Sequence, residues 1–122
     1  MLAVERSTTL VADLQDQPVG FVIVDVAPLG RPYGPWASPS VARIDAIAVV
    51  PRARVQGVGS QLVAAAEELA RKEGAVVMTL MTATRNMNGR RLFDSAGFIE
   101  FMTSADSYAN GDDAELMFKS IA

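Results

Sequence analysis

An apolar run that leads directly into a glycine turn and an amphipathic run constrains this fold more than any other segment. The run Val41–Val50 is apolar at most positions and is followed by Pro51. After Gly57 and Gly59, apolar residues return every three or four positions as far as Glu73. These patterns predict a strand, a tight turn and a helix N-terminus in immediate succession. Glycine lacks a Cβ, and N–H groups converge at the positive end of a helix, so the segment predicts a cradle for pyrophosphate.

Three kinds of phosphate-binding turn are alternatives for this segment. A P-loop requires Gly-Lys followed by Ser or Thr, and no lysine follows Gly57 or Gly59. A dinucleotide-binding turn requires a third glycine three residues after the second, where this chain has Leu62. The remaining pattern, Arg/Gln-x-x-Gly-x-Gly/Ala, is matched by Arg54, Gly57 and Gly59. This last pattern is typical of loops that bind the pyrophosphate of acyl-CoA.

A second motif lies downstream, at residues 86–98. It reads Asn-x-x-Gly-x-x-Leu-Phe-x-x-x-Gly-Phe, close to the pattern Asn-x-x-Ala-x-x-Leu-Tyr-x-x-x-Gly-Phe. Together with the first motif and the apolar residues 47–51 that enter it, this segment resembles the GNAT superfamily of acyl-CoA N-acyltransferases. The resemblance extends over residues 9–120.

The chain is expected to form one α+β domain over residues 1–122, since this length is typical of a single domain. The resemblance implies a mixed, mostly antiparallel sheet flanked by helices, lacking the strand and two helices with which the family usually begins. The hydrophobic patterns predict the element order β-β-β-α-β-α-β-β. The expected strands are residues 9–14, 19–26, 41–50, 75–82, 98–103 and 114–121, and the expected helices are residues 57–73 and 87–96.

The absence of histidine and cysteine excludes several kinds of catalysis. A cysteine nucleophile, a Ser-His-Asp triad and most zinc sites are removed together, and no metal is expected. The net charge of −3 argues against general nucleic-acid binding. Basic residues nevertheless gather in or beside the two motifs, which suits a small polyanion such as CoA. These residues are Arg52, Arg54, Arg85, Arg90 and Arg91.

The apolar runs fall far short of the roughly 18 residues of a membrane span, and residues 1–12 lack the pattern of a signal peptide. We therefore expect a cytoplasmic protein with neither a membrane nor a nucleic-acid partner. The missing first elements of the family would leave apolar sheet surface uncovered, so we expect a homodimer or a larger oligomer.

The resemblance implies acetyl-CoA, or another acyl-CoA, as the cofactor. Its pantetheine arm would pair with the backbone of residues 47–49 like an added strand, and the amides of residues 55–60 would hold its pyrophosphate. Asn86 would contact the cofactor from the second motif. The cofactor-binding residues expected from the resemblance are Ile47, Ala48, Val49, Arg54, Val55, Gln56, Gly57, Val58, Gly59, Ser60 and Asn86.

The reaction implied is direct attack of a primary amine, on a small molecule or a peptide, on the thioester. A base must take the proton of the amine, and Asp45 is the candidate. It lies two residues before Ile47, so strand alternation places both on one face, where burial would raise the pKa of the carboxyl. The alternative is that Asp45 forms an ion pair with Arg43 or another arginine.

Phe93 stands where the family usually has a tyrosine that protonates the leaving thiolate, and phenylalanine has no proton to donate. The chain therefore has a second interpretation as a non-catalytic acyl-CoA-binding module. A third interpretation is a structural domain in which the glycines serve only the turn. Acceptor specificity is expected to come from the loops at residues 29–40 and 104–113 and from any partner subunit.

Overall fold

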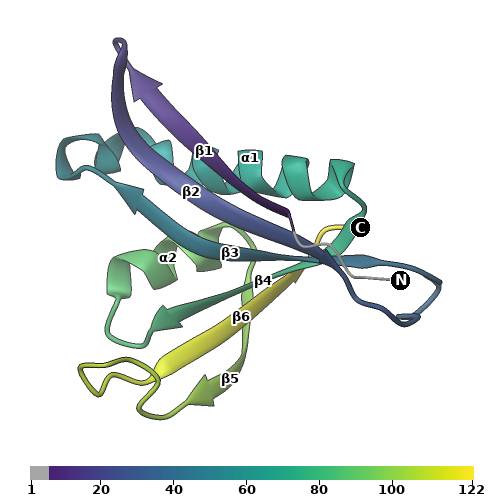
Figure 1. Ribbon diagram of the computed structural model, residues 1–122. Helices are drawn as coiled ribbons and strands as arrows, with labels where there is room; N and C mark the ends of the chain where they lie inside the picture. Colours follow the sequence, from purple (N-terminus) through teal and green to yellow (C-terminus); the bar gives the residue numbers. More distant parts are fainter. Residues whose placement is uncertain (1–5) are drawn as a thin grey trace.

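Six strands, two α-helices and one short 3₁₀ helix make up the fold of the computed structural model, which describes residues 6–122 (Figure 1). The expected order of strands and helices is confirmed, and the 3₁₀ helix after Pro51 was not predicted. None of the described helices is long and apolar enough to cross a bilayer. The elements are β1 (Arg6–Leu14), β2 (Gln17–Pro28), β3 (Ser40–Val49), the 3₁₀ helix η1 (Pro51–Gln56), α1 (Val58–Lys72), β4 (Ala75–Ala83), α2 (Met87–Ser95), β5 (Ile99–Ser104) and β6 (Ala114–Ser120).

The strands form one sheet in the order β1-β2-β3-β4-β6-β5. Only β3 and β4 are parallel among the described strand pairs, and the rest of the sheet is antiparallel, as expected for this fold class. The last described ladder pair between β3 and β4 joins Ile44 to Leu80, although β3 continues to Val49 and β4 to Ala83. The two strands diverge beyond that pair and form a fork (Figure 1).

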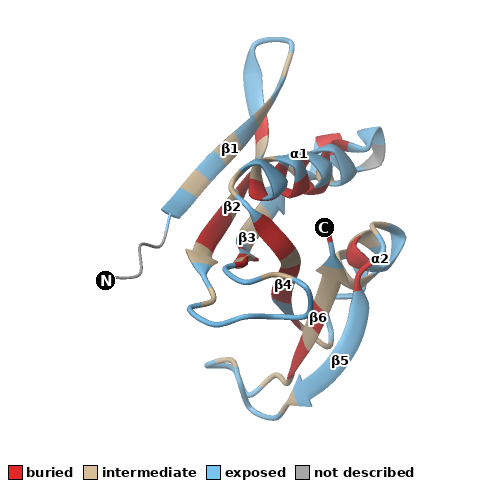
Figure 2. Ribbon diagram, turned by 90° about the vertical axis from the view of Figure 1, so that its right-hand side faces the viewer, coloured by how far each residue is buried: buried red, intermediate tan, exposed pale blue. Residues whose placement is uncertain are grey.

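Both α-helices cover the same face of the sheet (Figure 2). The stripe of α1 that faces the sheet includes Val58, Leu62, Val63, Ala66 and Ala70, all buried. Gly20 on β2 brings strand and helix close together, because a Cβ there would lie 3.2 Å from the Leu62 side chain and 2.8 Å from the carbonyl oxygen of Ala48. The core is therefore a single layer of side chains between the sheet and α1.

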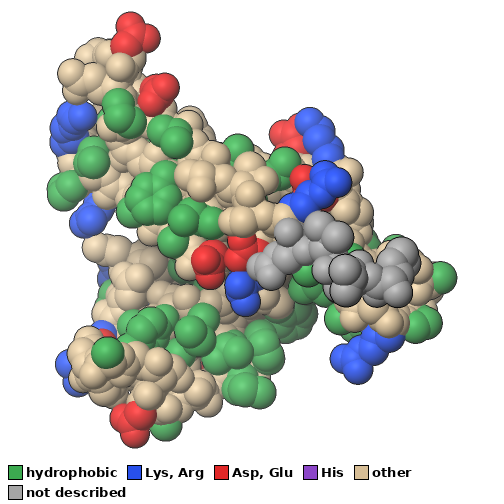
Figure 3. All heavy atoms as spheres, in the orientation of Figure 1, with side chains coloured by type: hydrophobic (Ala, Val, Ile, Leu, Met, Phe, Trp, Pro, Cys, Tyr) green, Lys and Arg blue, Asp and Glu red, His purple; other side chains and the backbone are tan. Residues whose placement is uncertain are grey.

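No described helix covers the opposite face of the sheet, and large hydrophobic side chains are exposed there. Figure 3 looks onto this face, where hydrophobic side chains surround a small group of charged ones. We call this surface the open face. Its exposed members, assigned to this side by strand pairing and by the Phe101–Phe118 ring contact, are Val11, Phe21, Met81, Ile99, Phe101 and Met102.

A buried carboxylate ties α1 to the C-terminal strand. Glu67 is 6% exposed; its Oε1 accepts a hydrogen bond of 2.7 Å from Lys119 Nζ, and its Oε2 accepts one of 3.2 Å from Arg71. Lys119 also donates to the carbonyl of Ala96, just after α2, and Arg71 donates to the carbonyl of Ile121. One carboxylate thus binds two cations. Lys119 also contacts the residue after α2, and Arg71 contacts the residue after β6.

We predict that Glu67→Gln lowers the free energy of unfolding by about 2 kcal/mol, because it leaves two partly buried cations without a counter-charge. The neighbouring variant Glu68→Gln is the control, since the Glu68–Lys72 pair is exposed on both sides. Such pairs contribute less than about 0.5 kcal/mol. Urea unfolding with equal slopes measures both values. Equal losses in the two variants would contradict the prediction.

Candidate functional site

A cleft of about 650 Å³ opens at the fork between β3 and β4. It is bounded by the end of β3, by the start of α1 and by α2. The structure brings eight of the predicted cofactor-binding residues to this cleft: Ile47, Ala48, Val49, Arg54, Gly57, Gly59, Ser60 and Asn86.

The start of α1 presents backbone N–H groups to the cleft. Gly57 adopts a left-handed conformation, with φ of 75°, and no described side chain caps the helix. The Gln61 N–H donates to the carbonyl of Gly57 at 3.1 Å, so helix geometry offers no acceptor to the N–H groups of Val58, Gly59 and Ser60. With the helix dipole behind them, these amides favour an anion at this position.

The two glycines of the turn serve different purposes. A Cβ on Gly57 would meet no atom within 4 Å, so the glycine is required by its positive φ and the space in front of it is open. A Cβ on Gly59 would lie 3.2 Å from the side chain of Leu92 on α2. Gly57 therefore shapes the turn, whereas Gly59 allows the two helices that border the cleft to approach.

Arg54 connects the turn to the strand that enters it. Its Nε donates a hydrogen bond of 3.1 Å to the carbonyl of Val49, while its side chain stays exposed. The Val49 carbonyl is therefore engaged, and the backbone groups left for an added chain are those of the other residues at the end of β3.

Two other described residues of the first motif, Gln56 and Val58, do not line the cleft with their side chains. The side chain of Val55 is outside the described part of the structure. Gln56 donates to the carbonyl of Arg52 at 3.4 Å and borders a separate cavity of about 320 Å³. Val58 is buried in the core, so it can face the cleft only through its backbone N–H.

Asn86 holds the first turn of α2 in place. Its Oδ1 accepts a hydrogen bond from the Gly89 N–H at 3.1 Å, and its Nδ2 donates to the Thr82 hydroxyl at 3.2 Å. The side chain is thus a helix cap that also ties α2 to β4. Its predicted contact with a cofactor stays a prediction.

The prediction that Asp45 is buried on the same face of the sheet as Ile47 is wrong. Val24 pairs with Ile44 and Ile23 pairs with Ala46, so Asp45 is the extra residue of a β-bulge. The bulge breaks the two-residue alternation, and Asp45 lies away from the face of Ile47. Its side chain is 52% exposed and lies 3.7 Å from the Arg43 guanidinium, as the ion-pair alternative predicted.

The sequence also missed residues that α2 contributes to the cleft. Phe93 reaches it from below, buried and in edge contact with Phe98 at 6.0 Å between ring centroids. Helical spacing of three and four residues from Asn88 could have identified the others. They are Asn88, Arg91, Leu92 and Ser95, and Gly89 beside Asn88 lines the cleft as well.

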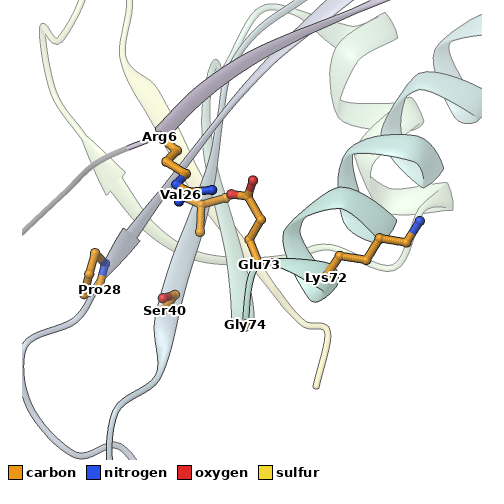
Figure 4. A pocket seen from close by; sticks show the side chains of 7 residues that line it. All are labelled: Arg6, Val26, Pro28, Ser40, Lys72, Glu73 and Gly74. Carbon is orange, nitrogen blue, oxygen red and sulfur yellow. The ribbon is translucent and has the colours of Figure 1, made fainter.

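Another cavity, of about 570 Å³, lies at the opposite end of α1 and of the sheet (Figure 4). Arg6 and Glu73 point toward each other there, near Val26 (Figure 4). None of the predicted site residues lines it, and the described residues contain no cluster of carboxylates suited to a metal. The fork is therefore the candidate site.

Comparison with known proteins agrees with the fold and with the two motifs. Residues 2–98 match the model of the Acetyltransferase (GNAT) family. The chain belongs to this family, which confirms the resemblance seen in the sequence.

Individual relatives are similar over most of this chain. The uncharacterized N-acetyltransferase YhfO of Bacillus subtilis (strain 168) is 32% identical over 98 residues. That match covers 78% of this chain, and the chain spans about 60% of the relative's length.

Two solved structures are also similar. Nourseothricin acetyltransferase is 27% identical with a TM-score of 0.78, over 95% of this chain and 66% of that one. Chaetomium thermophilum Naa20, solved with a bisubstrate analogue, is 25% identical with a TM-score of 0.77, over 90% and 64% of the two chains.

Proposed function

We propose that this chain, as a single domain, transfers an acyl group from acyl-CoA, most simply acetyl-CoA, to a primary amine. The observation that carries the proposal is the uncapped N-terminus of α1, which opens into the cleft where β3 and β4 part. The open space in front of Gly57 leaves room for a bulky anion at those amides. Membership of the acetyltransferase family supports the same interpretation.

The residues of the cleft fit the parts of CoA. The amides of Val58, Gly59 and Ser60 would hold the pyrophosphate, with Arg54 and Arg91 supplying positive charge. Beyond the pair Ile44–Leu80, no strand of the described residues lies beside β3 on the cleft side. The amide-containing pantetheine arm would lie along residues 47–49 by β-augmentation. When bound, acyl-CoA would supply an activated thioester.

The chain's own residues would then assist direct attack by the amine, with no covalent enzyme intermediate. A backbone N–H at the end of β3 would stabilise negative charge on the acyl oxygen, an effect that contributes about 3 kcal/mol. We propose Asp45 as the proton acceptor, because the bulge places it on β3 just before the fork. Its exposure allows the proton to pass on to solvent.

Phe93 leaves the departing thiolate without a side-chain acid at that position. A thiol with a pKa of about 8.5 can leave as the thiolate and take its proton from water. The interpretation as a non-catalytic binding module remains the second candidate because of Phe93. Both candidates include CoA binding, and only the transferase releases a thiol in the presence of an amine.

We predict that Ser60→Glu weakens CoA binding about tenfold or more, because a carboxylate would occupy the anion position at the helix N-terminus. The free energy of unfolding without ligand should not fall, since acidic residues stabilise the first turn of a helix. Gln61→Glu is the matched control, since it adds the same charge one residue further on, where the side chain is exposed and does not line the cleft.

Thermal shift and titration calorimetry with acetyl-CoA measure this binding. At about 100 times its Kd, a ligand adds about 2.7 kcal/mol to the free energy of unfolding. Absence of any shift for the wild-type protein at millimolar acetyl-CoA would refute the proposed function.

We predict that Asp45→Asn lowers kcat/KM for the amine about a hundredfold, because the neutral amide cannot accept the proton. A screen of small-molecule and peptide amines, following thiol release from acetyl-CoA, measures the rate. CoA affinity should be the same in the variant and serves as the internal control. Full turnover in Asp45→Asn would remove this residue from the mechanism.

The proposal also includes a cytoplasmic location, where the absence of cysteine fits a reducing compartment, and a homodimer formed through the open face. The exposed apolar side chains of that face would be covered by the same face of a second copy.

We predict that the wild-type protein is a dimer by light scattering at micromolar concentration and that Met102→Glu shifts it to monomer. A charge at this exposed position on β5 would have to be buried in the interface. Lys72→Glu, at an exposed position of α1 on the opposite side of the sheet, should stay dimeric. A monomeric wild-type protein would contradict the dimer and leave the transferase proposal unaffected.

A further inference from the structure

Helix α2 forms one border of the cleft, and its hydrophobic contacts with the core come from Leu92 and Phe93, past the middle of the helix. Phe93 is its one buried side chain among the described residues, and it lies near the C-terminal end. A helix of nine residues whose apolar contacts both lie past its middle needs polar contacts to fix the position of its first turn. That first turn carries Asn88 and Gly89, which line the cleft.

Arg90 supplies these polar contacts. Its Nε lies 2.6 Å from Oε2 of Glu115 on β6, and its NH1 donates a hydrogen bond of 3.1 Å to the carbonyl of Thr84 in the loop before the helix. Glu115 is 3% exposed, and the Arg90 side chain is 34% exposed. One guanidinium therefore connects the helix, the sheet and the loop that joins β4 to α2.

The same strand position is connected to the helix cap. Glu115 pairs with Thr82 across β4 and β6, and the Thr82 hydroxyl accepts the hydrogen bond from Asn86. The first turn of α2 is thus held to both strands of this pair. Asn86 connects it to Thr82 of β4, and Arg90 connects it to Glu115 of β6.

We infer that Arg90 and Glu115 are positioning residues, which act through α2 to set the width of the cleft between the start of α1 and the first turn of α2. Neither side chain lines the cleft. The expected effect on CoA affinity rests on the proposed function. The effect on α2 itself does not depend on that function.

The charge on Glu115 makes this contact sensitive to acid. Burial raises the pKa of Glu115 above its ordinary value of 4.5, and a hydrogen bond with Glu100 of β5 raises it further. Arg90 opposes the rise, while Glu100 and Asp94 of α2 add to it through their negative charge. Its described neighbour on β4, Thr82, carries no charge.

Falling pH therefore removes the charge on Glu115 and breaks the ion pair with Arg90. The effect of acid on global stability has the opposite sign. A carboxyl group whose pKa is higher in the folded state than in the unfolded state stabilises the fold most below the unfolded-state pKa. This contribution to the free energy of unfolding is lost as pH rises through the folded-state pKa. Protonation of Glu115 would therefore weaken CoA binding without lowering the free energy of unfolding. This combination distinguishes a positioning role from a purely structural one.

The experiment compares wild-type protein with Arg90→Lys and Glu115→Gln. Lysine keeps the charge but cannot span both partners, and glutamine keeps the shape of Glu115 without its charge. Arg85→Lys is the matched control, because Arg85 lies just before α2 with an 85% exposed side chain and pairs with Asp112 at 3.4 Å.

The two measurements are hydrogen exchange of the backbone amides and calorimetric titration with CoA. In Arg90→Lys and Glu115→Gln we expect exchange in residues 86–95 to rise about tenfold, with α1 unchanged, and the Kd for CoA to rise about tenfold. Arg85→Lys should match the wild type in both. The wild-type Kd should also rise more between pH 7 and pH 5 than that of Glu115→Gln.

Unchanged exchange in residues 86–95 in both variants would overturn the inference. So would faster exchange spread equally over α1 and α2, which would indicate a general loss of stability. Faster exchange confined to α2 with an unchanged CoA affinity would also overturn it. A wild-type protein that fails to bind CoA would refute the proposed function instead, and the exchange result would still decide whether Arg90 holds α2.

Discussion

The end of pairing between β3 and β4 is the constraint on which the rest of the structure depends. Parallel strands normally continue side by side, but here the ladder stops at Ile44 and Leu80. The bulge at Asp45 follows immediately and changes the course of β3, as bulges do by bending a strand and increasing its twist. The fork, the cleft within it and the placement of α1 at its mouth all follow from that divergence.

Polar contacts hold the two helices that lie beside this opening. Glu67 with Lys119 joins α1 to β6, and Arg90 with Glu115 joins α2 to the same strand. Both contacts place a buried carboxylate against a partly exposed cation. The helices on the two sides of the cleft are therefore held by ion pairs to β6, which does not itself line the cleft.

Much of the fold could be predicted because the chain's local signals agree with one another. The glycine turn, the period of α1 and the order of the strands are all marked by residues that suit the local backbone, such as Gly57 at its positive φ. The cleft could be predicted for the same reason, since the two motifs carry most of its lining.

The environment of Asp45 could not be predicted, because it depends on a bulge that no glycine or proline marks in the sequence. Strand alternation is a reliable guide only where the register is regular. The 3₁₀ helix after Pro51 was missed for a related reason, since its few residues have no period of their own. The contribution of α2 to the cleft depended on which face of the helix packs against the core, and the positions of Phe93 and Leu92 in the structure show that face.

The free rim of β3 at the fork has a consequence for handling the protein. Unpaired N–H and C=O groups on a strand edge are a template on which a strand from another molecule can add. A ligand that lies along residues 47–49 would shield those groups just as a neighbouring strand does. Filling the fork would thus protect concentrated samples against self-association and precipitation, as well as serve chemistry.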